Sequence, residues 1–415
     1  MKHGLCPLGL RCLLWFGLAS SATGQEWTRF RGPDGCGISD ATTIPVTWTA
    51  KDYNWRVTLP GIGHSSPVIW EDRVFVTSAI EEDATLTLHC LDTADGSLIW
   101  KRDFQSTPHA KNDSNSYAAA SPALDEDHVY ITWATPEKYI VLALDQSDGR
   151  EVWRRDLGSF IAEHGFGASP IVFEDLVIVA NDQDETSFAT ALDRATGQPR
   201  WKADRRIVMA AYSTPMIFRP EGRSPELIVT GWAHGVASLD PRTGKENWEV
   251  DVLNHRVVCS PMSAGGLIFT SCGSGGGGKQ MVAVRPADPT RGVEAGVAYE
   301  ITNSLPYVPT SVARGNLLFL WSDSGVVACL DAPTGEVHWR ERVGGNYFGS
   351  PVRVGDRIYC MSRDGEMVVV AAADEFKLLG RIDLEEPSQA TAAISGGVMY
   401  LRTRSHLMAI GGKPQ

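Results

Sequence analysis

The sequence lacks the patterns that mark most metal-dependent and hydrolytic enzymes. Its ten histidines show none of the spacings of a zinc site, because there is no HExxH motif and no pair of CxxC motifs. The Gly-x-Ser-x-Gly turn of the serine hydrolases is also missing. The glycine run at residues 273–278 is followed by Lys279 and Gln280, whereas a phosphate-binding loop needs Ser or Thr after the Lys. We therefore expect no bound metal, and no motif identifies a catalytic residue.

Runs of positive charge are missing as well. The 415 residues include 38 Lys and Arg against 50 Asp and Glu, which gives a net charge of −12 at pH 7. Nucleic acids and anionic membranes attract clustered basic side chains, so we expect neither as a partner. After the N-terminus no stretch approaches the roughly 18 consecutive apolar residues of a membrane span, so no transmembrane segment is expected.

The N-terminus has the layout of a secretory signal peptide. Lys2, His3 and Arg11 supply positive charge, residues 12–19 form a short apolar stretch, and residues 20–24 are small. We predict cleavage near Gly24, which leaves residues 25–415 as a single domain in the periplasm or secreted. Neither Cys6 nor Cys12 follows the apolar stretch as a lipid-modified cysteine would, so we expect a soluble exported protein rather than a lipoprotein.

A hairpin pattern repeats five times in the remaining chain. Each copy has Leu-Asp, a Gly four residues after the Asp and a Trp eight residues after it, and the five Trp are Trp100, Trp153, Trp201, Trp248 and Trp339. The Asp side chain can bond the backbone of the turn, and Gly supplies the positive φ that the turn needs. The returning strand then delivers each Trp to the same depth, where we expect it to pack between neighbouring sheets.

A second pattern marks the start of each repeat. It begins with a small residue that is followed in most copies by Pro. An apolar pair, a two-residue turn and a run of alternating residues that forms the next strand come after it. The eight starts lie at Ser66-Pro67, Ser121-Pro122, Ser169-Pro170, Thr214-Pro215, Ser260-Pro261, Pro309-Thr310, Ser350-Pro351 and Thr391-Ala392. Proline favours a sheet edge, such as the strand that lines a central channel. Four short strands per repeat of about 45 residues predict an all-β, eight-bladed β-propeller of four-stranded antiparallel blades.

Two segments refine this prediction. The last repeat ends too early to supply its outer strand, and residues 54–59 resemble the outer strand at residues 152–157. We therefore expect the N-terminal strand to complete the last blade and close the ring, which removes free sheet edges. The fifth repeat lacks the Asp…Gly…Trp hairpin and continues instead through a longer stretch to Tyr299.

These repeats resemble those of the PQQ-like repeat propellers. That family includes the quinoprotein alcohol and glucose dehydrogenases and the non-enzymatic propeller lipoprotein of the outer-membrane β-barrel assembly machinery. The resemblance covers nearly all of residues 25–415. The opening Phe30-Arg31-Gly32-Pro33-Asp34-Gly35 also resembles the start of many exported members.

The resemblance leaves two functions open, because a fold hosts many activities. The dehydrogenases are longer, hold the quinone beside an adjacent Cys-Cys pair and bind Ca²⁺ through Glu, Asn and Asp, and this sequence has no adjacent Cys pair. Our first hypothesis is an exported, non-catalytic binding or scaffold propeller that recognises a protein, peptide or glycan without a cofactor. The alternative is a small quinoprotein-type oxidoreductase that acts on alcohols or sugars with PQQ and calcium.

One rim of the ring is the expected binding face. In a propeller, the loops before the innermost strands and the loops between the second and third strands meet around one mouth of the channel. Aromatic rings with a few Arg and His at a concave mouth are typical of a recognition site. The candidate residues are His64, His164, Tyr212, Tyr347, Trp133, Trp232, Trp321, Arg363 and Arg404. Two interpretations stay open, namely that the rings recognise a ligand or that they fill the channel and support its wall.

A disulfide is predicted between Cys259 and Cys272. Export permits oxidation, and the two residues flank a hairpin with the turn Gly265-Gly266. The register of a two-residue turn places them opposite each other at a non-hydrogen-bonded pair, where Cα atoms lie about 4.5 Å apart. A disulfide accepts roughly 4.4–6.8 Å. Two reduced thiols are the alternative.

The other four cysteines of the exported chain have no predicted partner. Cys90 and Cys329 occupy the same strand position in different repeats, so we expect them to be too far apart to pair. The sequence does not determine the state of Cys36 and Cys360.

Overall fold

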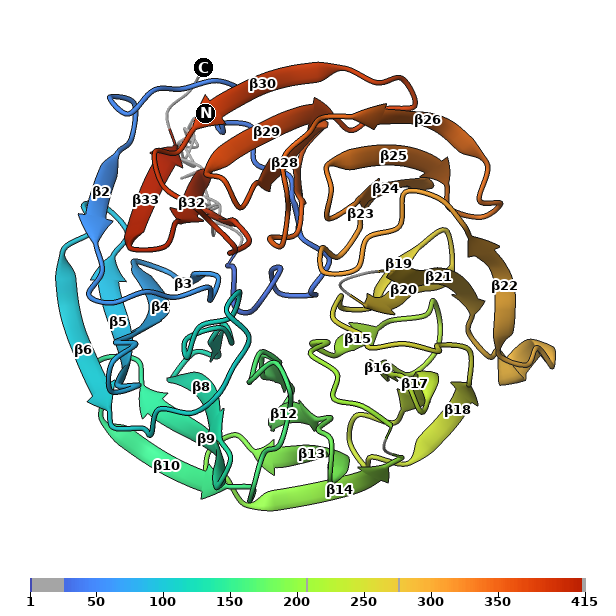
Figure 1. Cartoon of the computed structure of the whole chain (residues 1–415), viewed down its shortest axis with the longest axis horizontal. Helices are drawn as coiled ribbons and strands as arrows, with labels where there is room; N and C mark the ends of the chain where they lie inside the picture. Colours follow the sequence, from blue (N-terminus) through green and yellow to red (C-terminus); the bar gives the residue numbers. More distant parts are fainter. Residues whose placement is uncertain (2–25, 207, 275–276, 413–415) are drawn as a thin grey trace.

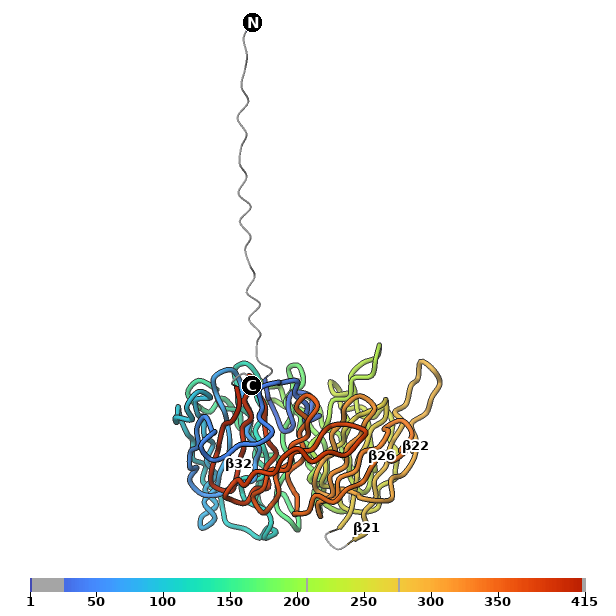
Figure 2. Tube along the Cα trace, turned by 90° about the horizontal axis from the view of Figure 1, so that it is seen from above, coloured from blue at the N-terminus to red at the C-terminus, as the bar shows by residue number. Residues whose placement is uncertain are grey.

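The protein is a ring of eight antiparallel sheets around a central axis (Figure 1). The computed structural model describes Met1 and residues 26–206, 208–274 and 277–412. Seen from the side, the ring is a thick disc (Figure 2). The predicted eight-bladed all-β propeller is confirmed. The predicted signal peptide, residues 1–24, lies outside the described residues apart from Met1 and stays a prediction.

Each blade has four strands that run in order from the axis to the outside. Blades 1 to 4 are β3(Val68–Trp70) β4(Arg73–Ala79) β5(Leu86–Asp92) β6(Leu98–Phe104); β7(Ala123–Leu124) β8(His128–Thr135) β9(Lys138–Asp145) β10(Glu151–Asp156); β11(Ile171–Phe173) β12(Leu176–Asn181) β13(Ser187–Asp193) β14(Pro199–Arg205); and β15(Met216–Phe218) β16(Glu226–Gly231) β17(Gly235–Leu239) β18(Glu246–Val250). Blades 5 to 8 are β19(Met262–Ala264) β20(Leu267–Ser274) β21(Gly277–Arg285) β22(Gly296–Ile301); β23(Val312–Arg314) β24(Leu317–Trp321) β25(Val326–Asp331) β26(Val337–Arg342); β27(Val352–Val354) β28(Arg357–Met361) β29(Glu366–Ala371) β30(Leu378–Asp383); and β31(Ala393–Ser395) β32(Val398–Arg402) β33(His406–Gly411) β2(Trp55–Thr58).

The burial of each strand follows from its place in the blade. The second and third strands are buried over most of their length, and β12 is buried throughout, because neighbouring blades cover both faces of the sheet. The outer strands alternate, and β6 buries Trp100 and Phe104 while the residues between them stay exposed. In the part of the chain that the structure describes, the one helix is the short η1(Pro289–Arg291), and none is long and apolar enough to cross a membrane.

The repeated Trp and Gly residues lock adjacent blades together. The Trp100 indole nitrogen donates to the Gln146 carbonyl of blade 2 at 3.0 Å, and its ring lies on Gly149. A Cβ on Gly149 would meet that ring at 2.6 Å, so the turn needs Gly for space as well as for its φ of +71°. Trp153, Trp201 and Trp339 donate to the next blade in the same way, so the predicted packing between blades is confirmed for four of the five Trp.

The irregular fifth blade replaces this Trp–Gly contact with other contacts on both of its sides. Because blade 5 offers no Gly turn to blade 4, Trp248 donates to Glu226 of its own blade at 2.8 Å. On the other side Tyr299 takes the place of a Trp. Its ring lies on Gly335, and its hydroxyl donates to the Ala332 carbonyl.

The N-terminal segment closes the ring, as predicted. Strand β2 pairs antiparallel with β33, the last strand of the chain, with Trp55 opposite Ala409. Figure 1 shows these two strands, from opposite ends of the chain, side by side. A further short strand, β1(Ile38–Ser39), pairs in parallel with the inner strand β27 and makes blade 7 five-stranded.

The predicted disulfide is not formed, because Cys259 and Cys272 are free thiols. The turn has the expected register, with Ala264 opposite Leu267, but the ladder ends at Met262. Beyond that point Cys259 Sγ contacts the backbone and hydroxyl of Ser271 at 3.1–3.3 Å instead of the opposite thiol. The other cysteines, Cys36, Cys90, Cys329 and Cys360, are free as well.

Candidate functional site

The residues that start the inner strands form a closed ring of hydrogen bonds around the channel. The backbone N–H of each of these residues donates to the side-chain hydroxyl of the equivalent residue in the next blade, at 2.8–3.2 Å. The N–H of Thr391 donates to Ser66 Oγ and closes the circle. We call these eight residues the hydroxyl belt: Ser66, Ser121, Ser169, Thr214, Ser260, Thr310, Ser350 and Thr391. A hydroxyl that accepts a hydrogen bond keeps its own proton to donate. The belt therefore retains eight O–H groups that can donate to a ligand.

Residues 26–39 run across the channel below the belt, and we call them the N-terminal plug. The dark-blue start of the described chain crosses the middle of the ring in Figure 1. Trp27 pairs with Ile69 of strand β3, and Arg29 donates to the Pro215 carbonyl at 3.1 Å. The plug therefore closes one end of the channel.

Arg31 fixes the plug to blades 6 and 7. Its guanidinium has five N–H donors and no acceptor. They meet five backbone carbonyls at 2.7–3.2 Å, namely those of Gly35, Cys36, Thr310, Ser311 and Pro351. Burial lowers the pKa of Arg31 to about 10, so the side chain stays charged at neutral pH. The sequence shows this motif but does not indicate its place in the ring.

A cavity of about 380 Å³ lies above the plug at the opposite mouth. All eight hydroxyls of the belt line it, together with Phe30 of the plug, and its rim carries His64, Asn112, His164, Tyr212, Tyr307, Phe348 and Gln389. This volume is within the range of small ligand pockets. The predicted face therefore carries a cavity.

Only some of the predicted site residues line this cavity. His64, His164 and Tyr212 do, and Arg363 stands on the rim with its guanidinium 4.2 Å from the centre of the Phe348 ring. Arg404 is exposed in the turn between β32 and β33.

The other predicted rings support the wall. Tyr347 and Trp321 are fully buried and pack edge to face, with centroids 5.3 Å apart. Trp133 is buried against Phe104, and Trp232 stacks on His255. None of these four predicted residues lines the cavity, because the rings turn sideways between loops and blades instead of toward the axis.

The long connection between β6 and β7, residues 105–122, was missed by sequence reasoning. Asn115 donates from its side chain to the His164 carbonyl of blade 3 at 2.7 Å, and Ser114 Oγ accepts from Arg363 of blade 7 at 3.2 Å. The loop thus joins both sides of the mouth and brings Asn112 to the cavity. Its length is the signal that could have indicated a functional role, because long irregular connections are uncommon.

The two cavity histidines are poor bases in this environment. Burial, reinforced by Arg402 and Lys111, lowers the pKa of His64 to about 3. Burial and Arg256 also lower the pKa of His164. Arg256 donates to His164 Nε2, and a guanidinium cannot accept, so that nitrogen is unprotonated and occupied. Neither ring is placed to activate a belt hydroxyl as a nucleophile.

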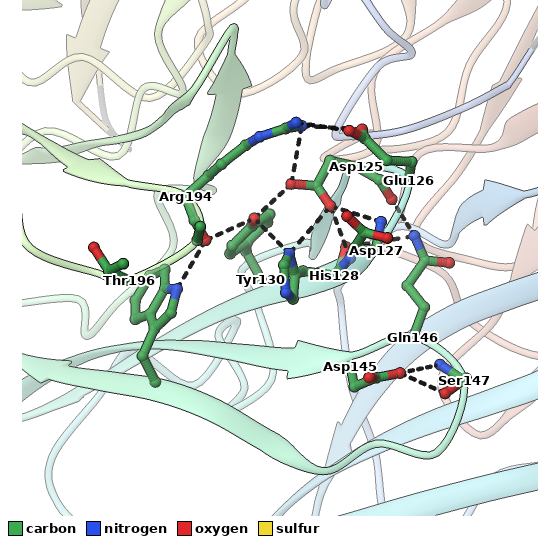
Figure 3. Close-up of polar contacts among 12 residues, drawn as sticks. Asp125, Glu126, Asp127, His128, Tyr130, Asp145, Gln146, Ser147, Arg194 and Thr196 are labelled. Atoms are coloured by element: carbon green, nitrogen blue, oxygen red, sulfur yellow. Dashed lines mark hydrogen bonds and ion pairs between the residues drawn. The ribbon is translucent and has the colours of Figure 1, made fainter.

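A second polar cluster lies on the opposite rim, between blades 2 and 3 (Figure 3). The Asp125 carboxylate accepts from Tyr130 Oη at 2.6 Å and pairs with Arg194, which also pairs with Glu126 at 2.6 Å. Burial, reinforced by the hydrogen bond to Asp125, raises the pKa of Tyr130. Because Arg194 of blade 3 pairs with two carboxylates of blade 2, the cluster links the two blades.

The cavity does not fit a calcium–quinone site. Among the described residues, no Asp or Glu lines it, and Glu163 and Asp323, whose neighbours or bonding partners His164 and Tyr307 do line it, are ion-paired with Arg256 and Lys279. Hard cations such as Ca²⁺ need several oxygen ligands, usually carboxylates. Among the described residues, no group of three or more His, Cys, Asp and Glu side chains could hold a metal ion.

Eight four-stranded blades around a plugged channel define a class of protein, the eight-bladed β-propellers with a cavity at one mouth. A family model described as the outer membrane protein assembly factor BamB matches residues 48–206, 84–291 and 233–411. These overlapping matches cover most of the ring, so the chain belongs to this family. No curated protein matches the sequence.

Solved structures with this fold include BamB and quinohemoprotein alcohol dehydrogenases. BamB from Moraxella catarrhalis has a TM-score of 0.62 at 16% identity, over 85% of this chain and 95% of that chain. A quinohemoprotein alcohol dehydrogenase from Pseudomonas putida has a TM-score of 0.65 at 12% identity, and one from Comamonas testosteroni has 0.64 at 14%, each over 94% of this chain and 81% of that chain. These identities show the fold alone, and the predicted resemblance to the PQQ-like propellers is confirmed.

Proposed function

We propose that this protein is an exported, non-catalytic propeller that binds a segment of another protein or a peptide in the mouth cavity. One observation carries the proposal: the cavity is walled by hydroxyl, amide and aromatic groups and by histidines that are poor bases. Such a wall can hold backbone carbonyls and side chains. It lacks an activated nucleophile or an ionised acid–base pair.

Export is supported by the predicted signal peptide at residues 1–24 and by the family's description as an outer membrane assembly factor. The same description favours a protein partner over a glycan.

Site-specific photo-cross-linking tests the proposed face. A photoreactive amino acid replaces Phe348, which lines the cavity, and in a matched control it replaces Leu98, which is exposed on the outer strand of blade 1. In extracts of the cells that make the protein, the Phe348 position should form discrete covalent adducts with other proteins or peptides, and the Leu98 position should not. Adducts at Leu98 alone, or at neither position, would contradict the proposal.

A titration with PQQ and Ca²⁺ tests the alternative enzyme. Because no carboxylate lines the cavity, we expect neither a bound chromophore nor dye-linked oxidation of alcohols or sugars. A stable quinone spectrum with such oxidation would overturn the proposal.

A further inference from the structure

One sector of the mouth is positively charged although the whole chain is acidic. Lys111 lies on the long β6–β7 connection, Arg363 in the turn between β28 and β29, and Arg404 in the turn between β32 and β33. Arg402, at the end of β32, is fully buried beside them. We call these four residues the cationic sector.

Three of the four cations have no acidic partner. Lys111 pairs with Glu81 at 2.8 Å, but none of the ion pairs among the described residues includes Arg363, Arg402 or Arg404. Arg402 donates to the carbonyls of Thr77 and Thr403, and its Nη2 is buried without a partner. Glu386, on the neighbouring turn, is the acidic group whose charge acts on Arg402, but it forms no ion pair with it. A buried guanidinium without a direct acidic partner is costly, so an anion close to it would stabilise the protein.

The ring of His64 reports the resulting field inside the cavity. After burial, the causes that lower its pKa are Arg402, Lys111, Arg404 and Arg363, all four members of the cationic sector. All four cations therefore lie close enough to act on a side chain of the cavity wall.

The opposite side of the mouth is different. There Arg256 pairs with Glu163 and Lys279 pairs with Asp323, each at 2.6 Å. These cations are neutralised, so an asymmetric ligand would turn its negative end toward blades 7, 8 and 1.

The hydrogen-bonding groups beside the cationic sector are mainly donors. Ser66 Oγ accepts from the Thr391 N–H and Thr391 Oγ1 accepts from the Ser350 N–H, which leaves both O–H groups to donate. The Gln389 amide lies beside them at the cavity, and no carboxylate lines it. Arginine forks and hydroxyl donors together match the geometry of a carboxylate.

We propose that the cationic sector recognises carboxylates of the bound segment, so that the partner of this propeller presents an acidic peptide to the mouth. This inference rests on the proposed peptide-binding function and names the chemistry of its ligand. The carboxylates lie over Arg363 and Arg404, while the rest of the segment contacts the belt and the aromatic rim.

Fluorescence anisotropy with three labelled octapeptides tests this inference. One alternates Gly and Glu and is blocked at both ends, the second has Gln in place of Glu, and the third is the Gln peptide with a free C-terminal carboxylate. We expect the Glu peptide to bind at least tenfold more tightly than the blocked Gln peptide at low salt, with the difference shrinking as salt screens the charges. Tighter binding of the third peptide than of the second would identify a terminal carboxylate as a second source of the recognised group.

The double variant Arg363→Ala/Arg404→Ala should abolish the preference for Glu. The matched control is Arg154→Ala/Arg242→Ala, which removes the same charge from exposed ion pairs away from the cavity and should keep it. Equal affinities for all three peptides, no binding of any, or equal losses in both double variants would overturn the inference. Cross-linking at Phe348 would still decide the proposed function separately.

Discussion

Glu386 shows how a single residue holds the mouth in shape. Its carboxylate accepts from the Ser405 backbone and hydroxyl and from Thr403 Oγ1, at 2.5–3.2 Å, and so fixes the turn that carries Arg404. Burial would raise the pKa of Glu386, but the hydrogen bonds from Ser405, Thr403 and His406 outweigh it and lower the pKa to about 2.

This depressed pKa predicts a pH dependence of stability. The pKa of Glu in an unfolded chain is about 4.3. The contribution of Glu386 to the free energy of unfolding is therefore complete above that pH and is lost as the pH falls toward 2. We expect Glu386→Gln to lower the free energy of unfolding by about 1–3 kcal/mol at pH 7 and by much less at pH 3. Urea unfolding at the two pH values measures this, with Glu336→Gln as an exposed control. A loss of equal size at both pH values would contradict the assignment.

The hydroxyl belt makes a second prediction for a single side chain. Replacing Ser169 by Ala removes the acceptor of the buried Ser121 N–H, which should cost about 1–2 kcal/mol. Ser169→Thr keeps the hydroxyl, as Thr214, Thr310 and Thr391 do in other blades, and should retain most of the stability. Equal urea midpoints for the Ala and Thr variants would show that the belt bond is not stabilising.

The Trp–Gly contact can be tested at the scale of neighbouring elements. Gly149 and Gly222 both have positive φ, +71° and +67°, but only Gly149 faces a ring, at 2.6 Å from the position of a Cβ. Ala substitution should strain the backbone similarly at both sites, while Gly149→Ala also forces Trp100 and blade 2 apart. We expect the thermal midpoint to fall clearly further for Gly149→Ala. Equal shifts would mean that the interblade contact contributes nothing.

The contacts of Arg31 predict how much the N-terminal plug stabilises the ring. Lys carries a point charge with three donors and cannot reproduce the planar five-donor fork of Arg31. We expect Arg31→Lys to destabilise the protein by about 2–4 kcal/mol, because buried carbonyls of blades 6 and 7 lose their donors. Arg154→Lys, at an exposed ion pair, is the control in the same urea titration. A loss no larger than that of the control would contradict the role of the plug.

The sequence predicts elements well where the constraint is local. The Asp…Gly…Trp spacing is set by one hairpin, so the blades and their interblade rings follow from it. The plug could not be predicted, because the carbonyls that Arg31 meets at Thr310 and Pro351 lie 279 and 320 residues further along the chain. The direction of Tyr347 was beyond reach for a similar reason, since loop conformation decides whether a rim ring faces the axis or a neighbouring blade.

At the scale of the whole molecule, the two ends of the chain cooperate to make the site. Strand β2 closes the ring against β33. The plug, which precedes β2 in the chain, crosses the channel and places Phe30 at the cavity. The predicted mouth was the correct face to consider, yet its chemistry comes largely from the belt. Those residues appeared in the sequence only as strand starts, because the circle they form exists only in the closed ring.

The acidic molecule carries its cationic sector on one side of the mouth. Its net charge of −12 would repel acidic partners from most of its surface. The cationic sector then attracts an acidic segment to one place, so electrostatics contributes specificity as well as affinity.

A crystal structure of the protein with the blocked Gly-Glu octapeptide would show where an acidic segment binds. We expect peptide density in the mouth cavity, with carboxylates on Arg363 and Arg404 and backbone or side-chain oxygens on the hydroxyls of Ser66 and Thr391. Peptide bound along an outer strand or on the rim around Asp125, with the mouth cavity free of peptide, would contradict it.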